Sequence, residues 1–563
     1  MKRLALIPIL LIASNAFAVT PSLHVNGIKY PDGTNTPNAF NVKAPECGAK
    51  GDGVTDDTTA IQTCVNLATA NGGTVFFPTP GQYKITSTIN VKSIYPVNLI
   101  SDMHSWPDSQ TAGSFIMPGA NFGTSASMIH YEAPAGSHSF HHGAGVVRGL
   151  SFYDPTNAVS APYTGSFTMQ AALDLYDFSL GTVRDCEFHM LNGGAIRAVN
   201  MVMGTIDNVT VRYSGTASIP AISLEPTGGA ANVQSTSISN SHIEANYGTY
   251  LSLNSTANEI KLDNLGFEYN PSLTGTNKTF IDNSSQHLFA NNIHLNRNSV
   301  TQFINEAAAN FLTMTNVVVL GDAIQTTANL SIVGANSNIS NLAIHNVTAQ
   351  TTAAIAITAA FANLSNINIL NSCGISISGN SYVNINGAVI DAPPSTCPSV
   401  VVDNSSFQVQ LQGINIIAVP VNMSGIRMTG TNRASSVIGC VVRDTSGTGV
   451  AFIDNGISGF TRWVGNAAYN NTTDWSATAT AFYGAGNYWS TGPNVVNKSG
   501  STLSFYGATA VTQPTSAGNT TTTAAGSTTN VFTNTTFAGG VGSTAYTVGD
   551  IVRALKQLGL IAQ

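Results

Sequence analysis

Three stretches, Asn292-Ile293-His294-Leu295, Asn316-Val317-Val318-Val319 and Asn341-Leu342-Ala343-Ile344, repeat one pattern at intervals of 24 and 25 residues. Each begins with an asparagine and continues with apolar side chains at alternate positions. We call the first residue the ladder position, and the series also contains Asp185, Asn208, Asn240, Asn264, Asn366, Gly387, Gly413 and Gly439. Such self-similarity predicts a solenoid of β-coils, in which each asparagine hydrogen-bonds its copies in neighbouring turns.

The strand after the ladder position shows which side chains face the interior. Its first and third positions are nearly all apolar, so a period of two places both on the inner face. Further strand families follow and precede this strand in each repeat. We therefore predict an all-β fold, a single-stranded right-handed parallel β-helix with three strands per coil and about 11–13 coils. The inner columns are Cys186, Val209, Ser241, Leu265, Ile293, Val317, Leu342 and Ile367, then Phe188, Val211, Ile243, Phe267, Leu295, Val319, Ile344 and Ile369.

Length and composition agree with a solenoid. A chain of 563 residues is too long for one compact domain, yet no charged or Pro-rich linker divides it. Only 9% of residues are charged, and the net charge of −7 argues against a nucleic-acid partner. We expect a signal peptide (1–18), an N-terminal segment with a capping helix (19–90), the β-helix (91–495), a Ser/Thr/Gly-rich tail (496–545) and a C-terminal amphipathic helix (546–563).

The signal peptide is predicted from Lys2 and Arg3, the apolar run 4–12 and the small residues Ala16 and Ala18. The run is too short to span a membrane, and no later segment qualifies. We therefore expect a protein secreted to the periplasm or the extracellular space, without a membrane span. Such a compartment allows disulfides, and Cys47–Cys64 and Cys373–Cys397 are candidate pairs. Cys186 and Cys440 follow ladder positions and are expected to be buried free thiols.

The segment Gly48-Ala49-Lys50-Gly51-Asp52-Gly53-Val54-Thr55-Asp56-Asp57-Thr58 precedes an amphipathic run, 59–70, and an apolar strand, 74–77. Here the sequence resembles the N-terminal motif of the pectate-lyase-like superfamily, shared by polygalacturonases, rhamnogalacturonases, β-1,3-glucanases and phage tailspikes. The resemblance implies a right-handed β-helix but indicates little about the reaction. We interpret Asp52, Asp56 and Asp57 as structural residues of a turn and helix cap, with the helix plugging the open coil.

The tail resembles a different group of proteins. Residues 503–514 and 546–560 are similar to segments near the ends of phage tail fibres and tailspikes. A short helix with Ile551, Val552, Leu555 and Leu558 on one face could assemble a homotrimer, dock elsewhere or cap the solenoid.

Polar side chains concentrate on the outward face between residues 185 and 296. The fourth position after the ladder reads His189, Arg212, Glu244, Glu268, Asn296, Leu320, His345 and Leu370, and the second reads Glu187, Thr210, His242, Gly266, His294 and Val318. Equivalent residues on adjacent coils are expected about 4.8 Å apart. In a chain with so few charges, this column is the strongest indication of a site.

Glu244 and Glu268 occupy the same position on consecutive coils. Their predicted separation of about 5 Å is close to the roughly 5–5.5 Å of a retaining glycosidase pair, so we take them as candidate catalytic residues. Arg212 could bind a uronate or sulfate, or hold Glu244 ionised. A solvated surface column is the alternative interpretation of all three.

Several other residues are candidates for substrate contact. On the next strand family, Glu225 is expected to face Arg197 on the preceding coil, with Asp282 a further acidic candidate. Tyr247 and Tyr269 could stack on sugars or simply pack turns. The His-rich stretch that begins at His130 lacks a recognised ligand spacing, so we predict no metal and no cofactor. The candidate substrate-binding residues are His189, Arg212, His242, Tyr247, Tyr269, His294, Asn296, Glu225 and Arg197.

The expected function is that of a secreted enzyme that cleaves an extracellular or cell-surface polysaccharide, by hydrolysis rather than elimination. In an elimination, His242 or Arg212 would act as the base. The paired-Asp and Gly-His-Gly motifs of polygalacturonases are absent, so their activity is not carried over. The alternative is a tailspike-like or surface glycan-binding protein with little catalysis.

Overall fold

A computed structural model describes most of residues 39–489 and two short hairpins. In the N-terminal hairpin, β1 (Leu23–His24) pairs with β2 (Gly27–Ile28), and in the C-terminal one β41 (Thr502–Leu503) pairs with β42 (Val511–Thr512), both antiparallel. The chain forms two units, residues 1–482 with 488–492, and residues 483–487 with 493–563. Within 39–489, the description leaves out 103–111, 121, 135–144, 157–168, 226–232, 255–256, 269–278, 298–301, 308–310, 322–327, 334–335, 347–351, 359–360, 380, 392–397, 404–405, 407, 420, 431–433, 446, 457–460 and 478–486.

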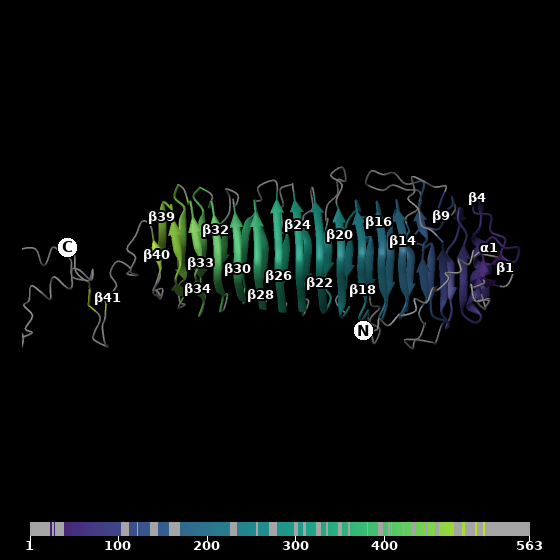
Figure 1. Cartoon of the computed structure of the whole chain (residues 1–563), viewed down its shortest axis with the longest axis horizontal. Coiled ribbons are helices and arrows are strands. Elements are labelled where there is room, and N and C mark those ends of the chain that lie inside the picture. Colours follow the sequence, from purple (N-terminus) through teal and green to yellow (C-terminus); the bar gives the residue numbers. More distant parts are fainter. Residues whose placement is uncertain are drawn as a thin grey trace, which may run out of the picture. The chain divides into compact units, whose positions relative to one another are not determined.

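The first unit is a parallel β-helix of about 12 coils, as predicted. Figure 1 shows its strands stacked side by side along one axis. Its 15-stranded sheet, here called the second sheet, runs along the helix axis, and each strand pairs in parallel with its neighbours in adjoining turns. The strands are β7 (Ile89–Lys92), β10 (Ile129–Glu132), β13 (Ala171–Tyr176), β15 (Gly194–Val199), β17 (Ile222–Glu225), β19 (Leu251–Leu253), β21 (Thr279–Asn283), β23 (Gln302–Ala307), β25 (Leu330–Val333), β27 (Ala353–Thr358), β29 (Cys373–Ser378), β31 (Val400–Val402), β33 (Ser424–Gly430), β36 (Val450–Gly456) and β39 (Thr473–Ala477).

The 23-stranded sheet contains the ladder positions, and we call it the ladder sheet. Its strands are β3 (Ala39–Asn41), β4 (Asp52–Asp56), β5 (Gly73–Phe77), β6 (Gly81–Ile85), β8 (Val97–Ser101), β9 (Ser114–Pro118), β11 (Val146–Arg148), β12 (Ser151–Tyr153), β14 (Thr182–His189), β16 (Thr205–Arg212), β18 (Ser237–Glu244), β20 (Ile260–Glu268), β22 (His287–Arg297), β24 (Phe311–Gly321), β26 (Asn336–Asn346), β28 (Phe361–Leu370), β30 (Tyr382–Asp391), β32 (Gln410–Ile417), β34 (Ser436–Ile438), β35 (Val441–Arg443), β37 (Arg462–Val464), β38 (Ala467–Tyr469) and β40 (Tyr488–Trp489).

The ladder residue is the bend between two straight segments of a coil. Asn264 has φ +54° in the middle of β20, so the segments predicted before and after it run on as one strand with a kink. Glycines occupy the same place further along, and Gly439 (φ +61°) separates β34 from β35. Asparagine and glycine are the residues that adopt this left-handed conformation most readily. The backbone therefore explains why the column contains only Asn, Asp and Gly.

The predicted asparagine hydrogen bonds are present along most of the column. The Nδ2 of Asn264 donates to Oδ1 of Asn240 at 2.8 Å, and Asn292 donates to Asn264 at 2.9 Å. The series is broken in two places, because Asn240 donates to Asp207 and Asn316 to Asn291 instead of to the ladder residue of the preceding coil. In both places the acceptor is the residue just before the ladder position of the preceding coil, Asp207 or Asn291.

Replacing Asn264 separates the two contributions of the ladder. Asn264→Ala is expected to lower the free energy of unfolding by about 2–4 kcal/mol, because it places an ordinary L-residue at positive φ and removes two side-chain hydrogen bonds. Asn264→Gly removes the same bonds without the strain, so its cost is about half as large. Chemical denaturation of the two variants measures the difference. Equal losses would show that hydrogen bonding, and not backbone conformation, selects the residue.

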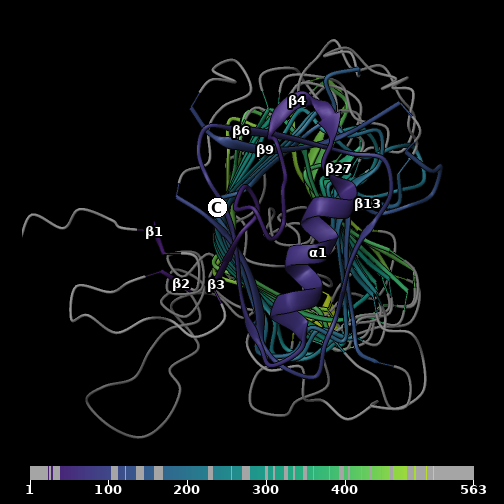
Figure 2. The same ribbon diagram turned by 90° about the vertical axis from the view of Figure 1, so that its right-hand side faces the viewer.

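The α-helix α1 (Thr58–Thr69) lies across the N-terminal end of the coil, as Figure 2 shows. It buries Ile61, Cys64, Val65 and Ala68 against the first strands, and a disulfide joins Cys64 to Cys47. The helix therefore plugs the end of the core, as the sequence predicts.

The aspartates before α1 bond differently from the predicted cap. The backbone N–H groups of Lys50 and Gly51 donate to Asp57 at 2.6 and 2.9 Å, so this N-cap residue holds the preceding turn and its side chain does not cap the helix. Asp56 accepts from Thr58 N at 3.0 Å and from Thr86 Oγ1 at 2.6 Å. Both residues are therefore structural.

Cys186 and Cys440 are buried free thiols. Burial raises the pKa of the Cys186 thiol to about 12 and that of Cys440 to about 11. Cys373 is disulfide-bonded, and its candidate partner Cys397 lies outside the described residues. The predicted signal peptide (1–18) and C-terminal helix (546–563) also lie outside them. Among the described helices, none is long and apolar enough to cross a membrane.

Candidate functional site

The charged column predicted from the ladder alignment lies in register on the ladder sheet. Arg212 on β16 is the direct partner of Glu244 on β18, and Glu244 is the partner of Glu268 on β20. Inward neighbours such as Ile243 and Phe267 are fully buried, which fixes the outward direction of the two glutamates. The alternation of the strands therefore presents Arg212, Glu244 and Glu268 as one row on the outer face.

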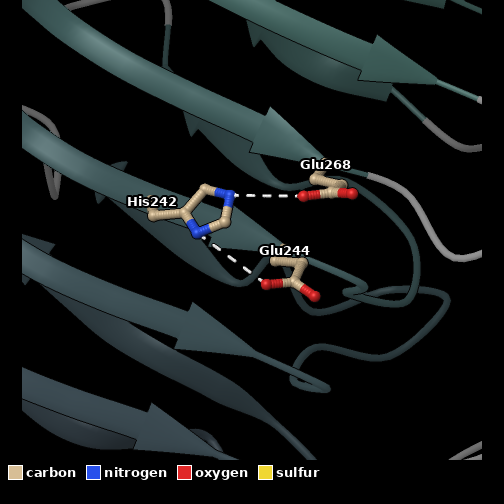
Figure 3. Close-up of side chains that lie close together, drawn as sticks. All are labelled: His242, Glu244 and Glu268. Atoms are coloured by element: carbon tan, nitrogen blue, oxygen red, sulfur yellow. Dashed lines mark ion pairs between the residues drawn. The ribbon is translucent and has the colours of Figure 1, made fainter.

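An arginine and a histidine contact the two carboxylates. Arg212 Nη2 lies 2.8 Å from Glu244 Oε1, and both side chains are about one-fifth exposed. His242 stands between the glutamates, with Nδ1 3.7 Å from Glu244 Oε2 and Nε2 3.8 Å from Glu268 Oε2 (Figure 3). Glu268 is more accessible, with 47% of its side chain exposed. The two carboxylates thus differ, because one is held by a cation and the other is open to solvent.

A glycine on the next coil makes room for the imidazole. Gly266 is the register partner of His242, and a Cβ at this position would lie 3.1 Å from His242 Cδ2. The His242 ring therefore leans over the bare backbone of β20, which brings Nε2 toward Glu268. A side chain at position 266 would occupy this space.

The same three residues could also hold a divalent cation. One ligand atom from each of His242, Glu244 and Glu268 lies within 4.8 Å of the other two, a grouping found within the described part of the chain. Imidazole and carboxylate ligands suit zinc and related metals. Arg212 already places a positive charge on Glu244, so an ion would share that carboxylate with a competing cation.

The remaining candidates of the column lie at different depths. On β22, His294 is exposed and Asn296 is half-buried, and Asn296 is the register partner of Glu268. Tyr247 is half-buried and packs against the core, and Tyr269 lies outside the described residues. His189 requires a correction, because it is only 7% exposed. Its ring stacks on Tyr153 at 5.8 Å and meets Tyr213 edge-on at 5.3 Å, so these rings cover it.

A second charged cluster lies on the second sheet. Arg197 Nε is 2.9 Å from Glu225 Oε2, the contact expected from the sequence, and its Nη1 is 3.2 Å from Asp174 Oδ1. His130 Nδ1 lies 2.8 Å from the other oxygen of Asp174. Asp282, on β21 of the same sheet, has its pKa raised by burial.

The sequence reasoning missed the pair His130 and Asp174. It treated His130 as part of a His-rich loop, whereas the structure places it on β10 in register with Asp174 on β13. The 44 residues between the partners exceed the usual coil length and hide the repeat. One signal in the sequence could have revealed this cluster. Asp174 lies 23 residues before Arg197, which is about one coil, and therefore at the equivalent position of the preceding strand.

Comparison with known proteins places the fold. The chain matches the family described as rhamnogalacturonase A/epimerase, pectate lyase-like, over residues 39–215, which confirms the resemblance predicted from the N-terminal motif. The phage-tail-like segments lie almost wholly outside the described residues. No curated protein matches the chain.

Solved structures with similar coils come from several kinds of protein. A surface adhesin of Streptococcus pneumoniae is 14% identical, with 76% of this chain and 91% of the adhesin covered and a TM-score of 0.37. The catalytic unit of an α-1,3-glucanase from Streptomyces thermodiastaticus is 12% identical, with 81% and 71% covered and a TM-score of 0.38. Tailspike protein 3 of bacteriophage CBA120 is 11% identical, with 82% and 62% covered and a TM-score of 0.30.

Proposed function

We propose that this protein is a secreted glycoside hydrolase that cleaves an extracellular or cell-surface polysaccharide at Glu244 and Glu268. The observation that carries the proposal is the pair of carboxylates on consecutive coils, with oxygens within 4.8 Å of each other and an imidazole between them. Retaining glycosidases hold their two carboxyl groups at a similar separation, about 5–5.5 Å. The predicted signal peptide supports the location.

The unequal surroundings of the carboxylates support a different role for each. Arg212 holds Glu244 in one orientation at 2.8 Å, which suits a nucleophile, and the exposed Glu268 is open to the solvent with which an acid/base exchanges protons. In the first step, the Glu244 oxygen bonds to the anomeric carbon, the glycosidic C–O bond breaks and Glu268 gives its proton to the leaving oxygen. In the second, Glu268 takes a proton from water, whose oxygen replaces Glu244 on the sugar.

His242 acts in this scheme as a positioning residue. Its two nitrogens face one oxygen of each glutamate, so the ring keeps the carboxylates apart and holds their orientation across two coils. Binding of the polymer along several coils would supply further rate enhancement by fixing the scissile bond over the pair.

The proposal is tested by incubating the purified protein with a panel of plant and bacterial polysaccharides. New reducing ends, without the ultraviolet absorbance of unsaturated uronates, are the expected result. An absorbance rise would instead identify an elimination, with His242 or Arg212 as the base. If no polysaccharide in the panel is cleaved while one is bound, the protein is a glycan-binding module.

That binding module is the second candidate function, and one observation favours it. His242 and Glu268 have 43% and 47% of their side chains exposed, so the pair lies on an open sheet face. An open face can bind a long polymer without excluding water from a reacting bond.

Gly266→Val tests the positioning of His242. The added side chain collides with the imidazole ring, so turnover is expected to fall by about tenfold to a hundredfold while the coil stays folded. Gly266→Ala, with a single methyl group, is expected to lose less. The turnover rates of both variants are measured, and their thermal unfolding verifies that the coil remains folded. A Val variant with undiminished turnover would remove His242 from the mechanism.

A further inference from the structure

A column of aromatic rings lies on the ladder sheet, C-terminal to the glutamate pair. The first outward residues of five consecutive strands, β22 to β30, are partners in register. Three of them are large and exposed, with Phe311 at 47%, Phe361 at 55% and Tyr382 at 36%. The aromatic column consists of His287, Phe311, Asn336, Phe361 and Tyr382.

The rings are ordered by the coil repeat. Phe361 and Tyr382 stack with centroids 4.7 Å apart and planes within 3°, and His287 meets Phe311 at 4.8 Å. These distances match the spacing between adjacent strands, so the two rings of each pair lie on neighbouring coils and contact each other. Asn336 separates the two pairs, which leaves Phe311 and Phe361 about 9.6 Å apart, or two strand spacings. Two exposed ring pairs in one row, with Asn336 between them, mark an interaction surface.

Neutral hydrogen-bonding groups, with one more exposed ring at Phe289, run parallel to the aromatic column. The other outward positions before the bend are held by Phe289, Thr313, Asn338, Asn363 and Asn384, then by Asn291, Thr315, Ser340, Ser365 and Asn386. Side chains of neighbouring coils form hydrogen bonds with each other here. For example, Asn363 Nδ2 donates to Asn338 Oδ1 at 3.1 Å. None of the residues at these described positions or in the aromatic column is Asp, Glu, Lys or Arg. The surface therefore offers rings, amides and hydroxyls without formal charge.

We propose that this face binds a neutral polysaccharide that lies along the coil axis. The apolar C–H faces of sugar rings pack on the exposed aromatic rings, and the adjoining amides and hydroxyls exchange hydrogen bonds with sugar hydroxyls. A periodic surface suits a polymer, because each added unit repeats the same contacts. No Lys or Arg lies among these positions, and Lys261 on β20 meets the face only at its edge, beside Phe289, so uronates, sulfated glycans and nucleic acids are disfavoured. This binding is separate from cleavage at Glu244 and Glu268, whose residues lie on other strands.

Affinity electrophoresis tests the inference with the Glu244→Gln/Glu268→Gln protein, in which cleavage is suppressed. The gels contain a mixed-linkage glucan, a galactomannan or dextran as neutral polymers, or polygalacturonate as the acidic one. Retardation by at least one neutral polymer and not by polygalacturonate is expected. Adding Phe361→Ala/Tyr382→Ala should weaken that binding at least tenfold, whereas Val389→Ala, at an exposed position beyond the bend on β30, should leave it unchanged.

Two controls keep the result interpretable. Phe361→Trp/Tyr382→Phe retains rings at both positions and should bind normally, even if the alanine variant unfolds. Sedimentation of the same proteins reports oligomeric state. Absence of retardation by every neutral polymer, or equal retardation of the alanine variant, overturns the proposal. So does dissociation of an oligomer by the alanine substitutions, which would make the aromatic column an interface between copies of this chain.

Discussion

Glu244→Gln and Glu268→Gln are each expected to lower kcat for polysaccharide hydrolysis by a factor of about 10²–10⁴. Glutamine keeps the size of each side chain but can neither attack the anomeric carbon nor donate an acidic proton. The two single variants and the double variant should be similarly inactive, since the groups act in one reaction cycle. Reducing-end assays at saturating substrate, with circular dichroism to verify folding, provide the measurement.

Glu132→Gln is the matched control for this prediction. Glu132 also pairs with a cation, Lys92 at 2.6 Å, and its side chain is 37% exposed, but it lies on β10 of the second sheet. Its replacement should leave kcat within a few-fold of the parent value. A small external anion such as azide should give a glycosyl azide of inverted configuration with Glu244→Ala, where it replaces the nucleophile, and one of retained configuration with Glu268→Ala, where it replaces the activated water. Loss of activity in Glu132→Gln alone would move the reaction to the second sheet, near His130 and Asp174.

Much of this site could be predicted because a solenoid converts sequence distance into position. Once the ladder residues are aligned, the register follows, and the partners Arg212, Glu244 and Glu268 are those of the structure. The contact between Arg197 and Glu225 was predictable for the same reason. Alternation then gives the outward direction, since Val211, Ile243 and Phe267 must fill the core.

The remaining features depend on side-chain conformation and on irregular turns, which a repeat does not encode. The place of His242 between two carboxylates requires the bare backbone of Gly266 on the next coil. The burial of His189 depends on Tyr153, which belongs to an early coil outside the asparagine series. His130 and Asp174 were missed because the chain between them is longer than a regular coil. Periodicity therefore located columns, whereas turns and neighbouring rings determined which of their members are accessible.

Trp463→Ala is expected to have the largest effect on stability, about 3–5 kcal/mol at the C-terminal end of the coil. Trp463 on β37 is fully buried. Its ring meets Phe452 at 5.8 Å and Trp475 at 4.7 Å, both edge-on, so one side chain links β37 of the ladder sheet to β36 and β39 of the second sheet. Its Nε1 also donates to Asp454 at 3.0 Å, and Asp454 is 2% exposed.

Trp463→Phe separates packing from hydrogen bonding. It keeps most of the ring contacts but removes the donor to Asp454, so we expect a loss of about 1–3 kcal/mol. Because each coil contacts only its neighbours, the damage should stay local. Hydrogen exchange should rise in β36 and β39 and remain unchanged near α1, and Val421→Ala at a 54% exposed site should alter neither region. Uniform loss of protection along the chain would instead mean that the coils unfold as one cooperative unit.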